Sequence, residues 1–214
     1  MNFGRSSEKN RTVPDEAQRR RATDNVLSQT LEIANMPEVQ DALERLGMGR
    51  LPHLLDKMYV PTVENGTIGA NKSNDFIPLV SIYPHETLSL NNAPVSLYTG
   101  RQEADGMTLA QPRPLVALAQ SNANSPTAPL VAIHEGAHVH QNRYHTVNNA
   151  PYERYRNFGS PKEVEALNVE AVVADVLIAS RRSRWYGNSR ILTPLSAQIR
   201  SRPPIIPYPR PKPY

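Results

Sequence analysis

Cysteine is absent from the 214 residues of this sequence. A zinc site with cysteine ligands and a disulfide framework are therefore both excluded. No apolar run approaches the roughly 20 residues of a membrane span, and the N-terminus lacks the apolar core of a secretory signal. The sequence thus predicts a protein without a membrane span that is cytoplasmic, or is exported without a classical signal peptide.

Acidic residues are absent from residues 181–214, which carry eight Lys and Arg. Residues 1–22 are also basic, with six Lys and Arg against three Asp and Glu, so the net charge of +4 conceals an acidic middle. Basic ends can bind nucleic acid, acidic lipid or an acidic partner. They can also simply keep a chain in solution, or fold back onto its acidic middle. The basic ends have few aromatic residues and no recognisable nucleic-acid motif, which argues against nucleic acid as the partner.

Composition divides the chain into three parts. Residues 1–22 are polar and predict a flexible basic segment. Residues 23–190 have the length and apolar content of a single domain. Residues 191–214 are a basic tail with six prolines in its last twelve positions. Such a tail favours an extended polyproline II conformation. It would bind a partner, lie as a strap across the body of the protein, or remain a disordered tail.

Apolar spacing and capping residues predict three N-terminal helices. Thr23 or Asp24 can cap a helix that ends near residue 35. A second helix is expected over 37–47, with proline in its first turn and glycine near its end. A third, shorter helix is expected over 51–58.

From Pro61 onward the residue pattern becomes typical of strands. Residues 77–83 predict a strand, and the alternating segments 88–90 and 95–98 predict a hairpin across an Asn-Asn turn. Residues 114–119 predict a further strand, which the neighbouring prolines place at the edge of a sheet. Predicted helices precede and follow these strands along the chain, which indicates the α+β class.

One motif indicates a metal site. It is a His-Glu-x-x-His in an apolar helix expected over 127–143. His134 and His138 leave the same face one turn apart, so two imidazole nitrogens can reach one zinc ion at roughly 2.0–2.1 Å. Glu135 can take a proton from water at an open metal position. His140 lies on the opposite side and is not a predicted ligand. Two core histidines with an exposed acid are the alternative, but buried His and Glu need partners.

A second helix, expected over 161–182, is apolar nearly all round and is predicted to be buried. Its acids Glu163, Glu165, Glu170 and Asp175 cannot all be solvated, and a buried carboxylate needs a cation. Glu163 and Glu170 are seven positions apart and share one stripe of the helix, while Glu165 lies on another.

The His-Glu-x-x-His segment resembles the active-site helix of the zincin metallopeptidases. In the metzincin branch a glycine and a third histidine follow, but these positions are Gln141 and Tyr144 here. The segment is therefore more similar to the gluzincin branch, in which a glutamate from a later helix completes the site.

The later helix carries the second part of this resemblance. The stretch Ser160-x-Lys-Glu163-x-Glu-Ala166 resembles the third-ligand helix of several gluzincin families, including CAAX-processing endopeptidases, which have Glu-x-x-Ala-Asp or Glu-x-x-Ala-Asn. The last position is Leu167 here, so Asn168, Glu170 or Asp175 would support a ligand instead. The resemblance favours Glu163 as the third ligand, with Glu170 and Glu165 as alternatives.

The resemblance implies a zincin-like fold with N-terminal helices, a small mixed sheet, an active-site helix and a buried third-ligand helix. Residues 115–119 would be the edge strand along which an extended substrate pairs. Zn²⁺ would be held by His134, His138 and Glu163, and Glu135 would be the general base of an endopeptidase acting on a protein or peptide.

Two questions remain open at the level of sequence. The residue that stabilises the oxyanion is one of several candidates: Tyr144, His145, Tyr152, Tyr155 and Tyr186. The scaffold could also be non-catalytic, serving as a metal-binding or protein-interaction module that uses the proline-rich basic tail.

Overall fold

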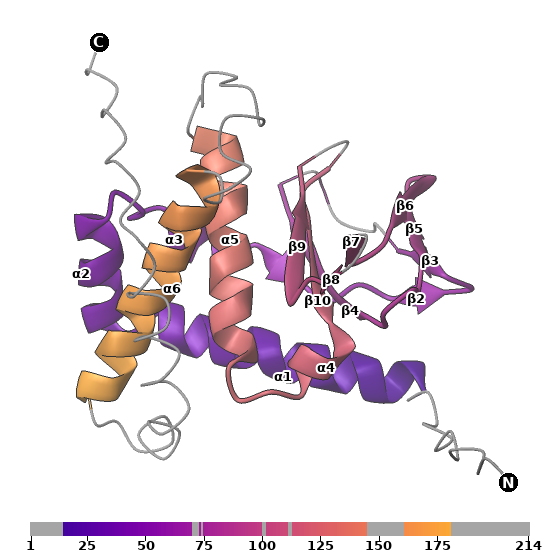
Figure 1. Ribbon diagram of the computed structural model, residues 1–214, viewed down its shortest axis with the longest axis horizontal. Coiled ribbons are helices and arrows are strands. Elements are labelled where there is room, and N and C mark those ends of the chain that lie inside the picture. The colour runs from indigo at the N-terminus through magenta and orange to yellow at the C-terminus, as the bar shows by residue number, and fades with distance from the viewer. Residues whose placement is uncertain are drawn as a thin grey trace, which may run out of the picture.

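The computed structural model describes residues 15–69, 73, 75–99, 102–110, 113–144 and 161–180. These residues form an α+β arrangement, as the sequence predicts. In Figure 1 the helices α2, α3, α5 and α6 gather on one side, the strands gather on the other, and α1 runs beneath both groups. The predictions for the proline-rich tail and for most of the oxyanion candidates lie outside the described residues.

The first helix, α1 (Glu16–Ala34), begins earlier than the sequence predicts. Its N-cap is Asp15, whose carboxylate accepts a hydrogen bond from the Gln18 amide at 2.7 Å. A start at Thr23 or Asp24 is therefore wrong, and so is a flexible segment as far as residues 15–22 are concerned. Residues 1–14 lie outside the described part of the chain.

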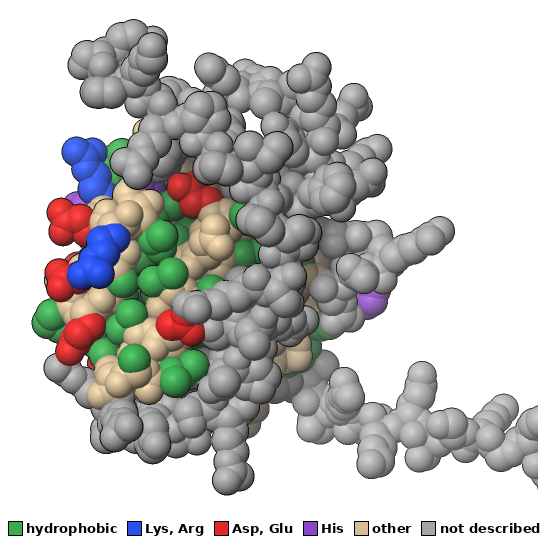
Figure 2. Space-filling view, turned by 60° about the vertical axis from the view of Figure 1, so that its left-hand side comes forward, with side chains coloured by type: hydrophobic (Ala, Val, Ile, Leu, Met, Phe, Trp, Pro, Cys, Tyr) green, Lys and Arg blue, Asp and Glu red, His purple; other side chains and the backbone are tan. Residues whose placement is uncertain are grey.

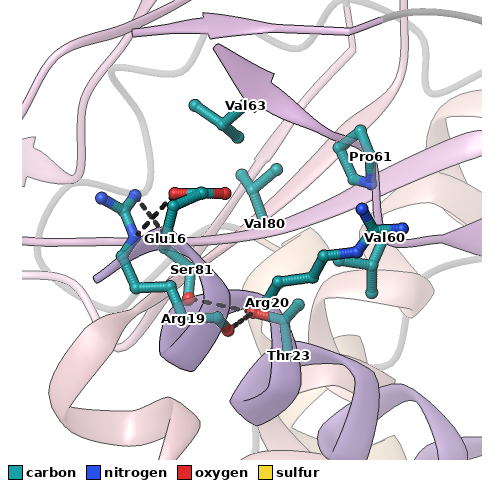
Figure 3. Close-up of a pocket in the computed structure, with 9 residues that line it drawn as sticks. All are labelled: Glu16, Arg19, Arg20, Thr23, Val60, Pro61, Val63, Val80 and Ser81. Atoms are coloured by element: carbon teal, nitrogen blue, oxygen red, sulfur yellow. Dashed lines mark hydrogen bonds and ion pairs between the residues drawn. The ribbon is translucent and has the colours of Figure 1, made fainter. Parts of the chain in front are cut away.

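Buried hydrogen bonds explain why this polar stretch is helical. Arg19 donates to the Glu86 carboxylate at 2.8 Å and to the Ser81 carbonyl at 2.9 Å. The Thr23 hydroxyl lies 2.9 Å from the Ser81 hydroxyl, on the strand β4 (Ile77–Ile82). Figure 3 shows this junction, with Arg19 and Thr23 pointing from α1 towards Ser81. Polar residues that suggest a solvated segment are thus part of the packing between helix and sheet.

The second and third helices follow their predicted starts. α2 (Pro37–Arg45) has proline in its first turn, and Gly47 after it has a φ of 76°. That φ lies in the left-handed region, which glycine adopts without steric cost and which commonly ends a helix. α3 (Leu51–Leu55) ends sooner than predicted because Met58 and Tyr59 form the strand β1.

The main sheet has the strand order β1–β4–β10–β9. β10 (Leu115–Ala119) pairs in parallel with β4 and antiparallel with β9 (Gly106–Leu109). The prediction of β10 as the edge strand is therefore wrong, and β9 holds that place among the described residues. Pro114 precedes the first residue of β10, so no proline interrupts its hydrogen bonds, and all five residues of β10 are buried.

A second sheet has the order β2–β3–β5–β6 and shares an apolar cluster with residues of β4 and β10 of the main sheet. Its hairpin turns at Asn91 and Asn92, which have φ values of 51° and 64°. This two-residue turn lets pairing resume at Ala93, so the second strand of the predicted hairpin begins earlier than expected. The strands are β2 (Val63–Glu64), β3 (Thr67–Ile68), β5 (Leu88–Leu90) and β6 (Ala93–Val95), and a separate pair joins β7 (Tyr98–Thr99) to β8 (Gln102–Glu103).

Three helices complete the described chain: α4 (Gln120–Ala123), α5 (Ala128–Tyr144) and α6 (Pro161–Ser180). α5 contacts α1, α3, α6 and β9 and lies at the centre of the larger apolar core. Figure 2 shows one face of the molecule, where the described hydrophobic side chains are scattered among acidic, basic and other groups. In the described parts of the chain, no helix combines the length and the hydropathy needed to cross a membrane.

Gly136 allows α5 to approach α3. A Cβ atom at this position would lie 2.6 Å from Leu55 Cδ2 and 3.3 Å from Leu51 Cδ1. We expect Gly136→Val to lower the free energy of unfolding by about 1–3 kcal/mol through overpacking. Gly49→Val is the matched control, because a Cβ there meets its nearest atom at 3.7 Å. Urea unfolding followed by circular dichroism measures both, and equal stability of the two variants would contradict this packing.

Candidate metal centre

The two histidines of α5 and one glutamate of α6 converge. The rings of His134 and His138 lie with their centroids 4.9 Å apart. Glu163 Oε1 lies 3.4 Å from His134 Nε2, and Glu163 Oε2 lies 3.1 Å from His138 Nε2. The three side chains offer ligand atoms that all lie within 4.8 Å of one another. Within the described residues, this cluster can hold a metal ion.

Helix packing places Glu163 at this point. Glu163 lies in the first turn of α6, and α6 packs against α5. The Glu163 side chain is 42% exposed, whereas that of His134 is 9% exposed. The cluster therefore lies at an end of the helix pair where solvent can reach it, with its histidine side closed.

Each imidazole has a second partner on its other nitrogen. His134 Nδ1 lies 3.1 Å from Glu170 Oε2, and His138 Nδ1 lies 2.9 Å from Gln141 Oε1. When Nδ1 carries the hydrogen and donates it to these oxygens, each Nε2 keeps its lone pair for the cluster centre. Glu170 thus supports His134 and is not the third member of the cluster.

Glu165, the remaining candidate for the third ligand, has a different partner. Its Oε2 accepts a hydrogen bond from Gln141 Nε2 at 2.9 Å. Glu163 and Glu170, which share one stripe of α6, both reach His134, whereas Glu165 on another stripe contacts Gln141.

The electrostatics of the cluster favour positive charge at its centre. Burial lowers the pKa of His134, but hydrogen bonds with Glu163 and Glu170 outweigh burial and raise this pKa to about 10. Hydrogen bonds from His134 and His138 hold the pKa of Glu163 far below its ordinary value. Where imidazole nitrogens and carboxylate oxygens hold a proton this strongly, a metal cation can compete with the proton for the same atoms.

Glu135 lies beside the cluster and beneath β9. It is 5% exposed, and this burial raises its pKa above the ordinary value. The Thr108 hydroxyl lies 2.7 Å from Glu135 Oε2 and 2.9 Å from the Glu135 carbonyl oxygen. A Cβ on Gly106 would lie 2.8 Å from Glu135 Oε1. Two residues on one face of β9 therefore surround the carboxylate closely, and the raised pKa suits a general base.

His140 and Tyr144 lie apart from the cluster. His140 is 3% exposed, and its ring centroid lies 5.0 Å from that of Tyr144. The Arg50 guanidinium covers the Tyr144 ring at 5.0 Å from the centroid. The Tyr144 ring is thereby engaged by His140 and Arg50, two residues that are not part of the metal cluster. The other oxyanion candidates, His145, Tyr152, Tyr155 and Tyr186, lie outside the described residues.

Sequence reasoning did not single out Thr108 or Gln141. Thr108 belongs to β9, a strand of four residues that the sequence pattern did not predict. Gln141 drew notice only because it replaces the glycine of the metzincin pattern. Its position three residues after His138, on the same face of the helix, was the available signal.

Comparisons with known proteins identify no relative. No model of a protein family matches the chain, and no curated protein or solved structure matches it. A function for this protein is therefore inferred from the motif and from the geometry around it.

The contact between Glu170 and His134 predicts a measurable effect on metal binding. Glu170→Leu removes the acceptor for His134 Nδ1, and we expect it to weaken zinc binding about 10–100-fold. Glu170→Gln keeps an acceptor oxygen of the same reach and should weaken binding less. Competition with a chromophoric chelator gives both affinities, and zinc binding of wild-type strength in Glu170→Leu would exclude this supporting role.

Proposed function

We propose that this protein is a zinc-dependent endopeptidase of the gluzincin type. The observation that carries the proposal is the contact of one α6 carboxylate, Glu163, with the Nε2 atoms of both motif histidines. A His-Glu-x-x-His helix completed by a glutamate from a later helix is the arrangement that this class uses. Two imidazoles and one carboxylate also leave a fourth position open, which is typical of catalytic rather than structural zinc.

His134, His138 and Glu163 would hold the ion. Bound zinc would polarise the substrate carbonyl and lower the pKa of a water molecule towards neutrality. Glu135 accepts the proton of the attacking water, for which its buried carboxylate with a raised pKa is suited. The same carboxyl group then delivers the proton to the leaving amine.

The edge strand β9 supports a peptide as the substrate. β9 pairs with β10 on one side and is the last strand of the main sheet among the described residues. The N–H and C=O groups on the outer side of an edge strand can pair with an added extended peptide. Gly106 and Thr108 of β9 contact Glu135, so a peptide along this strand would lie beside the general base.

Cleavage of an unstructured protein tests the proposal. We expect the purified full-length protein, loaded with zinc, to cleave casein into peptides detectable by mass spectrometry. Removal of the metal with 1,10-phenanthroline should stop cleavage, and added zinc should restore it. Cleavage that persists after complete metal removal would contradict the mechanism, and zinc binding without cleavage of any unstructured protein would favour a non-catalytic metal-binding module.

A further inference from the structure

Gln141 is a fully buried side chain between the two helices that form the metal cluster. Its exposed fraction is 0%. Its Oε1 lies 2.9 Å from His138 Nδ1, and its Nε2 donates to the Lys162 carbonyl at 2.8 Å and to Glu165 Oε2 at 2.9 Å. An amide side chain has one acceptor oxygen and two donor hydrogens, so these three partners use both ends of the amide.

The acceptor end of Gln141 acts on His138. An oxygen opposite Nδ1 favours the tautomer in which Nδ1 carries the hydrogen, so that the lone pair of Nε2 points to the cluster centre. The hydrogen bond also fixes the rotation of the imidazole ring. In the absence of this acceptor, His138 would be free to place its hydrogen on Nε2, which cannot then coordinate a metal.

The donor end of Gln141 acts on Glu163. Its two partners, Lys162 and Glu165, lie on either side of Glu163 in the first turn of α6. Holding this turn against α5 fixes the distance from which the Glu163 carboxylate reaches His138 Nε2, which is 3.1 Å. A helix end frays easily, so a buried tie at this place limits the positions open to the carboxylate.

We propose that Gln141 is the positioning residue of the metal centre, holding His138 directly and Glu163 through the first turn of α6. The proposal rests on the proposed metal site and adds to it the group that keeps ligands from two helices in one geometry. Gln141 needs no contact with the ion or the substrate for this role.

Replacement of the amide by an apolar side chain of similar shape tests the role. We expect Gln141→Met, in the full-length protein, to raise the dissociation constant for Zn²⁺ about 10–100-fold, the usual effect of losing a partner of a metal ligand. Gln120→Met is the matched control, since Gln120 is 5% exposed but belongs to α4. Its zinc affinity should equal that of the wild type. Circular dichroism shows whether each variant is folded.

Gln141→Glu tests the donor end of the amide separately from its acceptor end. The new carboxylate still accepts from His138 but cannot donate to Lys162 or to Glu165, so we expect weakened zinc binding here too. The visible spectrum of bound Co²⁺ should change in both Gln141 variants, because it reports the ligand geometry and not the stability of the fold.

The outcomes distinguish failure of the metal site from failure of the role proposed for Gln141. A wild-type protein that binds no zinc contradicts the metal site itself. A wild-type protein that binds zinc, together with a folded Gln141→Met variant of equal affinity and spectrum, overturns the role of Gln141 alone. Failure of both Gln141 variants to fold would make the residue a structural tie between helices and would also overturn the proposal.

Discussion

Glu135→Gln is expected to retain zinc and to lose hydrolysis. The amide has the shape of the carboxyl group but cannot accept the proton of the attacking water. General acid–base catalysis typically contributes about 10²–10⁴-fold to a rate, so the initial rate of casein cleavage should fall by at least two orders of magnitude. The three proposed zinc ligands are unchanged in this variant, and its zinc content should stay that of the wild type.

The control for this experiment is the same substitution at an exposed position. Glu44 lies on the surface of α2, and Glu44→Gln should leave both the cleavage rate and the zinc content unchanged. Rates and metal content are measured on the same samples. Full activity in Glu135→Gln would remove Glu135 as the base, and loss of zinc in it would make the residue part of the metal-binding set.

Glu163→Ala is expected to lose the metal. Glu163 contacts both imidazoles, so its removal leaves two of three protein ligands for the ion. After gel filtration in metal-free buffer, zinc should fall from about one ion per chain to background. Glu44→Ala is the matched control, because Glu44 is exposed on α2 and lies outside the cluster. It should keep about one zinc ion per chain.

The opposite pattern would reassign the third ligand. Zinc retained by Glu163→Ala but lost by Glu165→Ala or by Glu170→Leu would mean that the first turn of α6 sits differently when the metal is bound. Melting curves of the metal-free variants show whether a loss of zinc reflects a loss of fold.

The sequence predicts those features of the site that follow from the geometry of a single helix. His134 and His138 share a face because four residues make about one turn, whatever the rest of the chain does. The stripe of α6 limits the third ligand to a few acids for the same reason. The choice of Glu163 among them depends on how α5 and α6 pack, which no local pattern encodes. Both acids of that stripe contact His134, Glu163 at Nε2 and Glu170 at Nδ1.

The errors of prediction have the same origin. Arg19 looks like a residue of a solvated segment and Thr23 looks like a helix cap, but Ser81 and Glu86, far along the chain, pair with them. The prolines before β10 suggest an edge strand, yet a strand's position in a sheet depends on its neighbours, and β9 pairs with it. Gly106 and Thr108 matter only because β9 packs over α5, so long-range packing also decides which residues surround Glu135.

The metal content of the purified full-length protein tests the central claim most directly. Elemental analysis of the wild type beside His134→Ala is expected to find about one zinc ion per chain in the first and none in the second. Both samples are checked for native fold by circular dichroism. A wild-type protein that takes up no divalent metal when zinc is supplied, or a His134→Ala variant that holds zinc as well as the wild type, would contradict the account.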